Sequence, residues 1–224
     1  MANTPRTPLK REQIARRIAQ DFADGAIVNL GIGMPTLAAN YIPAGREILF
    51  HSENGLLGFG PAPEKGKEDP NLVNAGKEFV TMLPGGCFFH QADSFSMTRG
   101  KHVDVAVLGG MQVNPRGDLA NWKIKGAELG SIGGAMDIAR GAKQVFVAMT
   151  HTTNKGEPKI VNELTYPITA LKCVTRIYTD IAVIDVGPKG LVLREVAPGY
   201  SAADVQAVTE PKLTYEKEPA VIAI

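Results

Sequence analysis

Cysteine and long apolar runs are both scarce in this sequence. Its two cysteines, Cys87 and Cys173, are far apart in the chain, which excludes a disulfide framework and a zinc knuckle. No stretch approaches the roughly 18 apolar residues of a membrane span. The first residues, MANTPRTPLKREQIARR, lack the apolar region of a secretory signal peptide. We therefore expect a cytoplasmic protein that is neither exported nor anchored in a membrane.

A surplus of charge of one sign is missing as well. The 24 Lys and Arg residues nearly balance the 23 Asp and Glu residues, and no basic block is present. This composition gives no electrostatic reason to expect nucleic acid or an anionic membrane as a partner. With 224 residues, 44% of them hydrophobic, the chain is expected to form a single domain, residues 1–224, with a substantial core.

Glycine is the residue in excess. It occupies 24 of the 224 positions, against a usual share of about 7%. Because glycine lets the backbone approach a ligand or another segment closely, we expect several such approaches in this chain.

Apolar, β-branched segments predict the strands of the protein. Several are continuous apolar runs rather than alternations, which is typical of strands that are covered on both faces. We therefore predict the α/β class, with an open, mostly parallel sheet between helix layers. The predicted strands are 26–30, 47–50, 103–110, 144–149, 173–179, 181–186 and 191–196.

Three helices are predicted from apolar spacing and capping residues. Apolar residues every four positions predict an amphipathic helix over 8–24, which Gly25 would end. A proline at its first position predicts a second helix over 35–41. Ser201 is expected to cap a last helix, 201–209.

Two segments are predicted to lie outside regular core elements. Residues 61–70, rich in proline and charge, are expected to form a loop. The tail, residues 210–224, is expected to be a surface arm or an interface strand.

The first motif that could carry chemistry is NLGIGMP, residues 29–35. A strand here runs into Gly31 and Gly33 and then into a helix start, an arrangement that lets the backbone approach a ligand with anionic or carbonyl oxygens. The motif lacks the third glycine of a G-x-G-x-x-G fingerprint, so a dinucleotide site is disfavoured. A tight turn that binds no ligand is the alternative.

The second motif, HSENG, places Glu53 at the end of an apolar strand and two residues before Gly55. Burial of an unpaired carboxylate costs several kcal/mol, so either a function or an ion pair with a surface Lys or Arg is expected there. His51 and Glu53 share a strand face, as a metal pair would. A zinc deaminase is disfavoured, because neither cysteine lies in a P-C-x-x-C motif.

The third motif is GSIGGAMD, residues 130–137. Gly133 and Gly134 precede a helix start and could present backbone N–H groups to a developing oxyanion. No G-x-S-x-G elbow is present, which disfavours a serine hydrolase, and a plain glycine-rich loop is the alternative. Lys77, in NAGKE, is either a contact for an anionic ligand or a solvated surface charge.

Taken together, these motifs resemble a known family. NLGIGMP, SENGLLGFGP, NAGKE, DSFSMTRG, GDLANW and GGAMD occur in this order, and they are similar to the β subunit of the 3-oxoacid coenzyme A-transferases. The resemblance covers a core of about residues 9–209. It implies the open α/β fold of these enzymes, which is shared with ribose-5-phosphate isomerases.

The resemblance also implies roles for individual residues. Glu53, in S-E-N-G, would be the catalytic nucleophile, walled by Leu56, Leu57 and Phe59. The other implied or adjacent positions are Gly134 with Gly133 for the oxyanion hole, Asn29 and Lys77 for contacts with coenzyme A (CoA), and Asn54, Gly31 and Gly33 near the site.

The implied reaction is ping-pong transfer of CoA from succinyl-CoA to a 3-oxo acid through a glutamyl-CoA thioester. Acetoacetate is the favoured acceptor; 3-oxoadipate, or exchange between acetyl-CoA and a short-chain fatty acid, is the alternative. Neither a metal nor a permanently bound cofactor is needed, since CoA is a substrate. The implied partner is an α subunit, in an α2β2 assembly.

Three other interpretations remain open from the sequence. A sugar-phosphate isomerase would share the fold but would leave Glu53 unexplained. A non-catalytic subunit would leave the chemistry to the α chain. A CoA hydrolase would use water in place of the acceptor acid.

Overall fold

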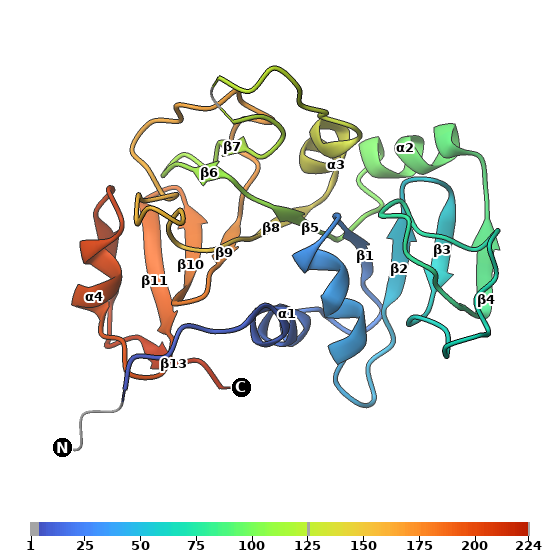
Figure 1. Cartoon of the computed structure of the whole chain (residues 1–224), viewed down its shortest axis with the longest axis horizontal. Coiled ribbons are helices and arrows are strands. Elements are labelled where there is room, and N and C mark those ends of the chain that lie inside the picture. Colours follow the sequence, from blue (N-terminus) through green and yellow to red (C-terminus); the bar gives the residue numbers. More distant parts are fainter. Residues whose placement is uncertain (1–4, 125, 224) are drawn as a thin grey trace.

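The computed structural model describes residues 5–124 and 126–223, and within them eleven strands form one mixed sheet (Figure 1). Its strand order is β12-β11-β10-β9-β8-β5-β1-β2-β3-β4, with β13 also paired to β11, while β6 and β7 form a separate hairpin. The strands are β1 (Ile27–Leu30), β2 (Leu49–Ser52), β3 (Leu56–Phe59), β4 (Met82–Phe88), β5 (Val105–Gly109), β6 (Gln112–Val113), β7 (Leu119–Ala120), β8 (Gln144–Ala148), β9 (Arg176–Tyr178), β10 (Ala182–Gly187), β11 (Gly190–Val196), β12 (Leu213–Thr214) and β13 (Ala220–Val221). The helices are α1 (Arg11–Ala19), α2 (Gln91–Arg99), α3 (Ala135–Gly141) and α4 (Ala202–Ala207), and η1 (Met34–Tyr41) is a 3-10 helix.

The centre of the sheet is parallel. Strands β9, β8, β5, β1 and β2 run in one direction, whereas antiparallel pairs β2·β3, β3·β4, β9·β10 and β10·β11 extend the sheet on both sides. The predicted open, mostly parallel α/β sheet is therefore confirmed.

Both faces of this central sheet are covered, as the continuous apolar runs predicted. In β5, Val105 and Val107 belong to one buried cluster, which also contains the apolar residues of α1. Ala106 and Leu108 belong to the cluster on the other face, with residues of α3 and α4. Successive side chains of a strand point to opposite faces, so only a strand between two covering layers can be apolar throughout.

The order in which successive strands are added to the sheet reverses at β1. Strand β2 follows β1 on one side, and β5 later returns to pair with β1 on the other. In open α/β sheets, ligands bind in the crevice outside the carboxyl ends of the strands at such a switch point. We therefore expect a ligand site at the carboxyl ends of β1, β2 and β5.

The helix predicted over 8–24 is wrong in its length, because α1 covers only Arg11–Ala19. The residues before it are extended, and their backbone donors are used elsewhere: Thr7 N–H donates to Pro198 O and Leu9 N–H to Asp180 O. The second predicted helix is η1, a 3-10 helix, and the last is α4, which Ser201 caps by accepting a hydrogen bond from Asp204 N–H.

Five elements, β3, β4, β6, β7 and α2, were not predicted from the sequence. Strand β4 contains Pro84, Gly85 and Gly86, which are unfavourable in a central strand, but proline is tolerated in an edge strand such as this one. Helix α2 has no apolar periodicity, because the side chains that it buries are those of Ser94 and Thr98. The pattern of apolar residues in the sequence therefore could not predict α2.

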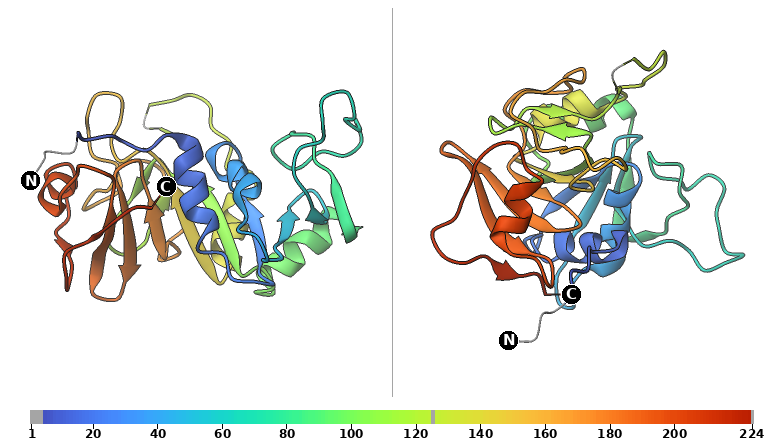
Figure 2. Two further views of the ribbon diagram at one scale, coloured as in Figure 1. Left: turned by 90° about the horizontal axis from the view of Figure 1, so that it is seen from below. Right: turned by 60° about the vertical axis from the view of Figure 1, so that its left-hand side comes forward.

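The remaining segments are the predicted loop and the tail. Residues 61–70 contain no helix or strand, and Figure 2 shows this segment in a loop that extends away from the sheet in both views. The tail expected as an arm contributes β12 and β13, both parallel to β11. In the part of the chain that the structure describes, no helix is long and apolar enough to cross a membrane.

Candidate active site

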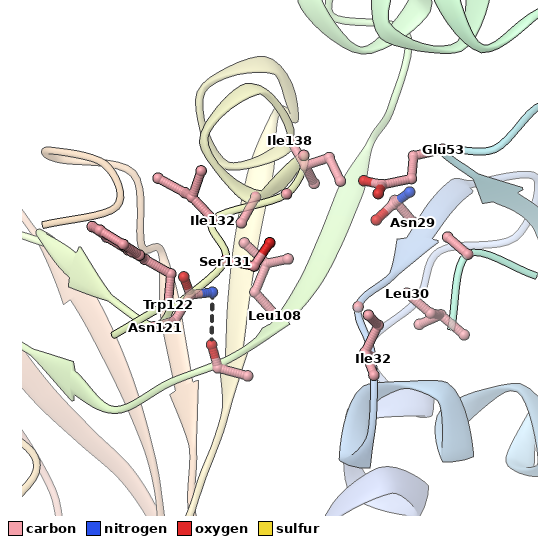
Figure 3. A pocket seen from close by; sticks show the side chains of 16 residues that line it. Asn29, Leu30, Ile32, Glu53, Leu108, Asn121, Trp122, Ser131, Ile132 and Ile138 are labelled. Carbon is pink, nitrogen blue, oxygen red and sulfur yellow. Dashed lines mark hydrogen bonds between the residues drawn. The ribbon is translucent and has the colours of Figure 1, made fainter. Parts of the chain in front are cut away.

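A cavity of about 310 Å³ lies at the carboxyl ends of β1, β2 and β5, where the strand order reverses (Figure 3). Glu53 and Asn29 face it from one side, and Ile132 and Ile138 face it from the other. The lining residues are Asn29, Leu30, Gly31, Ile32, Glu53, Ala75, Leu108, Gly109, Asn121, Trp122, Ser131, Ile132, Gly133, Gly134, Ala135 and Ile138.

Glu53 is held in the turn that joins β2 to β3. The turn is closed by a hydrogen bond from Gly55 N–H to Ser52 O, and Phe89 N–H donates to Gly55 O. Gly55 has a φ of +111°, and a Cβ there would lie 2.1 Å from Phe89 O. Only glycine fits this conformation and this approach, so the glycine of S-E-N-G fixes the turn that carries the glutamate.

The carboxylate of Glu53 lies directly against Gly134. A Cβ on Gly134 would lie 2.2 Å from Glu53 Oε2 and 2.8 Å from the ring of Phe95. The backbone N–H groups of Gly133 and Gly134 donate to no residue of the described part. The turn after β2 and the start of α3 thus bring a carboxylate and two free backbone donors to one place.

Glu53 is half-buried, and no described residue forms an ion pair or hydrogen bond with its carboxylate. Among the described residues, Glu53 therefore does not form the ion pair with a surface Lys or Arg that was the alternative to a function. Burial raises the pKa of Glu53, and the nearby Asp137 carboxylate raises this pKa further. Asp137 is itself paired with Arg99, at 2.8 Å. A carboxylate whose pKa is raised is a better nucleophile than one in water.

The family model described as Coenzyme A transferase matches residues 11–208 of this chain. The chain belongs to the coenzyme A transferase family.

Two related proteins are similar to this CoA-transferase chain over most of both lengths. A protein of Acinetobacter baylyi, named as a subunit of 3-oxoadipate CoA-transferase, is 58% identical over 202 residues, which are 90% of this chain and 93% of that protein. A protein of Bacillus subtilis, named as a subunit of a probable succinyl-CoA:3-ketoacid coenzyme A transferase, is 47% identical over 200 residues, 89% of this chain and 93% of that protein.

The fold is also similar to a solved structure. The crystal structure of an acyl-CoA transferase from Escherichia coli O157:H7, in a thioester complex with CoA, gives a TM-score of 0.72 at 20% identity. The match covers 98% of this chain but 44% of that chain, so this CoA-transferase chain spans less than half of that enzyme's length.

Five of the site residues predicted from the sequence line the cavity of this CoA-transferase chain: Glu53, Gly134, Gly133, Asn29 and Gly31. Gly31 is close-packed, since a Cβ there would lie 2.9 Å from Val107 O. The cavity brings these residues together from three separate sequence motifs. Their individual roles remain predictions.

Three other predicted residues do not line the cavity. Gly33, with a φ of +90°, starts η1. Asn54 donates to Val73 O at 2.8 Å and so ties the turn of Glu53 to the following loop. Lys77 is exposed on that loop, which is also bonded to β2 by Ala75 N–H donating to Ser52 Oγ at 2.8 Å. Of this loop, Ala75 reaches the cavity.

The predicted apolar wall of the site was wrong. Leu56 and Phe59 are buried in the core cluster that also contains residues of α1, and Leu57 does not line the cavity. The wall is instead made by Leu30, Leu108, Ile132 and Ile138, together with Ile32 and Trp122. These residues come from other strands and loops, so the sequence around Glu53 could not reveal them.

A buried polar cluster behind Glu53 was also missed. Asn29, His51 and Ser94 are at most 2% exposed, and they form a chain of hydrogen bonds across β1, β2 and α2. Burial lowers the pKa of His51 to about 4, so the ring is neutral at neutral pH. His51 was considered only as one half of a metal pair. In residues 5–124 and 126–223, no three His, Cys, Asp or Glu side chains are grouped to hold a metal ion.

Proposed function

We propose that this chain is the β subunit of a 3-oxoacid CoA-transferase, with Glu53 as the nucleophile that carries CoA. One observation carries the proposal: a half-buried carboxylate without an ion-pair partner among the described residues lies in a cavity at the strand ends, against a glycine with a free N–H. The membership of the chain in the CoA-transferase family supports the reaction class.

The reaction proceeds in two halves through covalent intermediates. A Glu53 oxygen attacks the thioester carbonyl of succinyl-CoA, and the C–S bond breaks to give a succinyl-glutamyl anhydride and CoA thiolate. The thiolate then attacks the glutamyl carbonyl and releases succinate, which leaves a glutamyl-CoA thioester. The carboxylate of the acceptor acid reverses both steps and regenerates Glu53.

Each attack on a carbonyl in these steps passes through a tetrahedral oxyanion. Gly133 and Gly134 line the cavity, and their backbone N–H groups are the proposed donors to this oxyanion. Removal of one such donor from an enzyme typically costs about 100-fold to 1000-fold in kcat. The apolar wall of Leu108, Ile132 and Ile138 limits the access of water. Water would otherwise hydrolyse the anhydride or the thioester.

Two acceptor acids are candidates. Acetoacetate is the acceptor expected first from the family resemblance. The relative named for 3-oxoadipate CoA-transferase has the higher identity of the two related proteins, 58% against 47%, so 3-oxoadipate fits at least as well. Succinyl-CoA is the proposed donor for both.

We propose that activity requires an α subunit. Both related proteins are named as single subunits of their transferases, and the chain spans 44% of the E. coli acyl-CoA transferase chain. An α2β2 assembly, in which the α subunit completes the CoA pocket, accounts for both facts. Lys77, exposed on the loop beside the cavity, is the proposed contact for the anionic part of CoA.

The test is mass spectrometry of the chain, purified with its α subunit, after brief exposure to succinyl-CoA. The expected result is a CoA adduct on the peptide that contains Glu53. Subsequent addition of acetoacetate to one sample and 3-oxoadipate to another identifies the acceptor, because only the true acceptor discharges the adduct quickly.

Glu53→Gln is the matched control. It should abolish the adduct without preventing assembly with the α subunit. Because burial raises the pKa of Glu53, the ionised carboxylate destabilises the fold above pH 4.5, so this variant should unfold at a slightly higher temperature at pH 7. An adduct that persists in Glu53→Gln, or fast discharge by water alone, would contradict the proposal.

A further inference from the structure

The polar cluster behind Glu53 determines the orientation of one side chain that faces the cavity. Asn29 on β1 and His51 on β2 are direct neighbours in the parallel register. The side-chain nitrogen of Asn29, Nδ2, lies 3.2 Å from His51 O and 3.0 Å from His51 Nδ1. A backbone carbonyl can only accept a hydrogen bond, so the amide nitrogen of Asn29, and not its oxygen, must face His51.

The same constraint fixes the proton on the His51 ring. Asn29 Nδ2 only donates, so His51 Nδ1 must accept and the proton must be on Nε2. Nε2 lies 2.8 Å from Ser94 Oγ, to which it donates. The Ser94 hydroxyl in turn points to Ser52 O at 3.4 Å. Burial lowers the pKa of His51 to about 4, which agrees with a neutral ring.

The amide oxygen of Asn29 is therefore left as an acceptor on the cavity side. Figure 3 shows this oxygen on the cavity side of the Asn29 amide and the nitrogen turned away from the cavity. Both hydrogens of the amide nitrogen are used by His51. A ligand next to Glu53 thus meets an acceptor whose orientation is held by residues that do not touch the ligand.

We propose that His51 is a positioning residue that, with Ser94, holds the Asn29 amide oxygen toward the cavity as the acceptor for an N–H donor of the CoA ester. This inference rests on the proposed function. The donor is the amide N–H nearest the sulfur of CoA, because only two carbon atoms separate that nitrogen from the sulfur bound at Glu53. The second amide of the same arm is too far from the sulfur to reach Asn29 at the same time.

Two succinyl-CoA analogues test the proposal with the assembled enzyme. In each, one amide N–H of the pantetheine arm is replaced by an ester oxygen. The near analogue should raise KM about tenfold in the unmodified protein, as expected for one lost hydrogen bond, whereas the remote analogue should not. In His51→Leu, the KM for succinyl-CoA itself should rise about tenfold with a smaller change in kcat, and the near analogue should cause no further loss.

Two variants separate positioning from a general loss of structure. His51→Gln supplies an acceptor for Asn29 and a donor for Ser94, so it should restore most of the KM. His151 is equally buried, between the hydroxyls of Thr179 and Thr209 and away from the cavity, so His151→Leu should lower the unfolding temperature but leave the KM unchanged.

The outcomes distinguish the inference from the function on which it rests. An equal penalty for the near analogue in the unmodified protein and in His51→Leu would refute the positioning role, as would a His51→Gln variant no better than His51→Leu. A normal KM in His51→Leu would refute it as well. If the unmodified protein formed no glutamyl-CoA adduct, both the proposed function and this inference would be refuted.

Discussion

Replacement of Gly134 by alanine is the sharpest test of how the site is built. The added Cβ would lie 2.2 Å from Glu53 Oε2, which is 1.2 Å short of the 3.4 Å at which ordinary contact begins. The Phe95 ring, at 2.8 Å, closes off a second direction. Because the carboxylate is the flexible end of its side chain, we expect it to swing away by about 1 Å while the fold persists.

This displacement sets the expected size of the effect. A misplacement of 1 Å in a reacting group can cost about 100-fold in rate, or roughly 2.7 kcal/mol of activation free energy. The assay is the rate of glutamyl-CoA formation by mass spectrometry in the assembled enzyme, together with the unfolding temperature. We expect the rate to fall about 100-fold with a change in unfolding temperature of only a few degrees.

Two glycine variants serve as controls for Gly134→Ala. A Cβ on Gly187 meets nothing within 4 Å, and Gly187 has no positive φ, so Gly187→Ala should change neither the rate nor the unfolding temperature. Gly156→Ala, outside the cavity lining, also meets nothing within 4 Å, but its φ of +80° should cost about 1 kcal/mol of stability with no loss of rate. A Gly134→Ala enzyme with a normal rate, or one that loses rate only in proportion to stability, would refute this account of the site.

Three further predictions follow from charge, burial and backbone geometry. Asp137→Asn should lower the pKa of Glu53 and so move the acidic limb of the pH–rate profile to lower pH. Arg99→Gln frees Asp137 from its ion pair and should move this limb to higher pH. Shifts of the same sign in the two variants would contradict the electrostatic explanation. Burial lowers the pKa of His151 from 6.5 to about 4, so its contribution to stability is complete above pH 6.5 and is lost as the pH falls toward 4. That contribution is about 3 kcal/mol, and urea unfolding at several pH values should show a shallower loss in His151→Gln. Gly55→Ala should destabilise the protein by at least about 2 kcal/mol, because its Cβ would lie 2.1 Å from Phe89 O. Gly45 also has a positive φ, but a Cβ there meets nothing within 4 Å, so Gly45→Ala should cost less. Equal unfolding temperatures of the two variants would argue against the clash.

Much of the fold could be predicted from the sequence because its signals are local. The apolar runs at 103–110 and 144–149 predicted strands covered on both faces, and β5 and β8 are such strands. Ser201 predicted the start of α4 through its own hydroxyl. Elements such as β4 and α2 could not be predicted because they depend on residues that are distant in the sequence. Strand β4 tolerates Pro84 because it lies at the edge of the sheet. Helix α2 can bury Ser94 and Thr98 because their hydroxyls form hydrogen bonds with buried partners.

The candidate site divides in the same way. By itself, the sequence indicated which residue is the unusual one, because burial of an unpaired glutamate at the end of an apolar strand costs several kcal/mol. Only the tertiary structure decided that Gly134, 81 positions along the chain from Glu53, lies against its carboxylate. It also decided that Leu108 and Ile138 form the wall in place of Leu56 and Phe59. These contacts join segments that meet only when β1, β2, β5 and α3 assemble, and no local pattern along the chain encodes such distances.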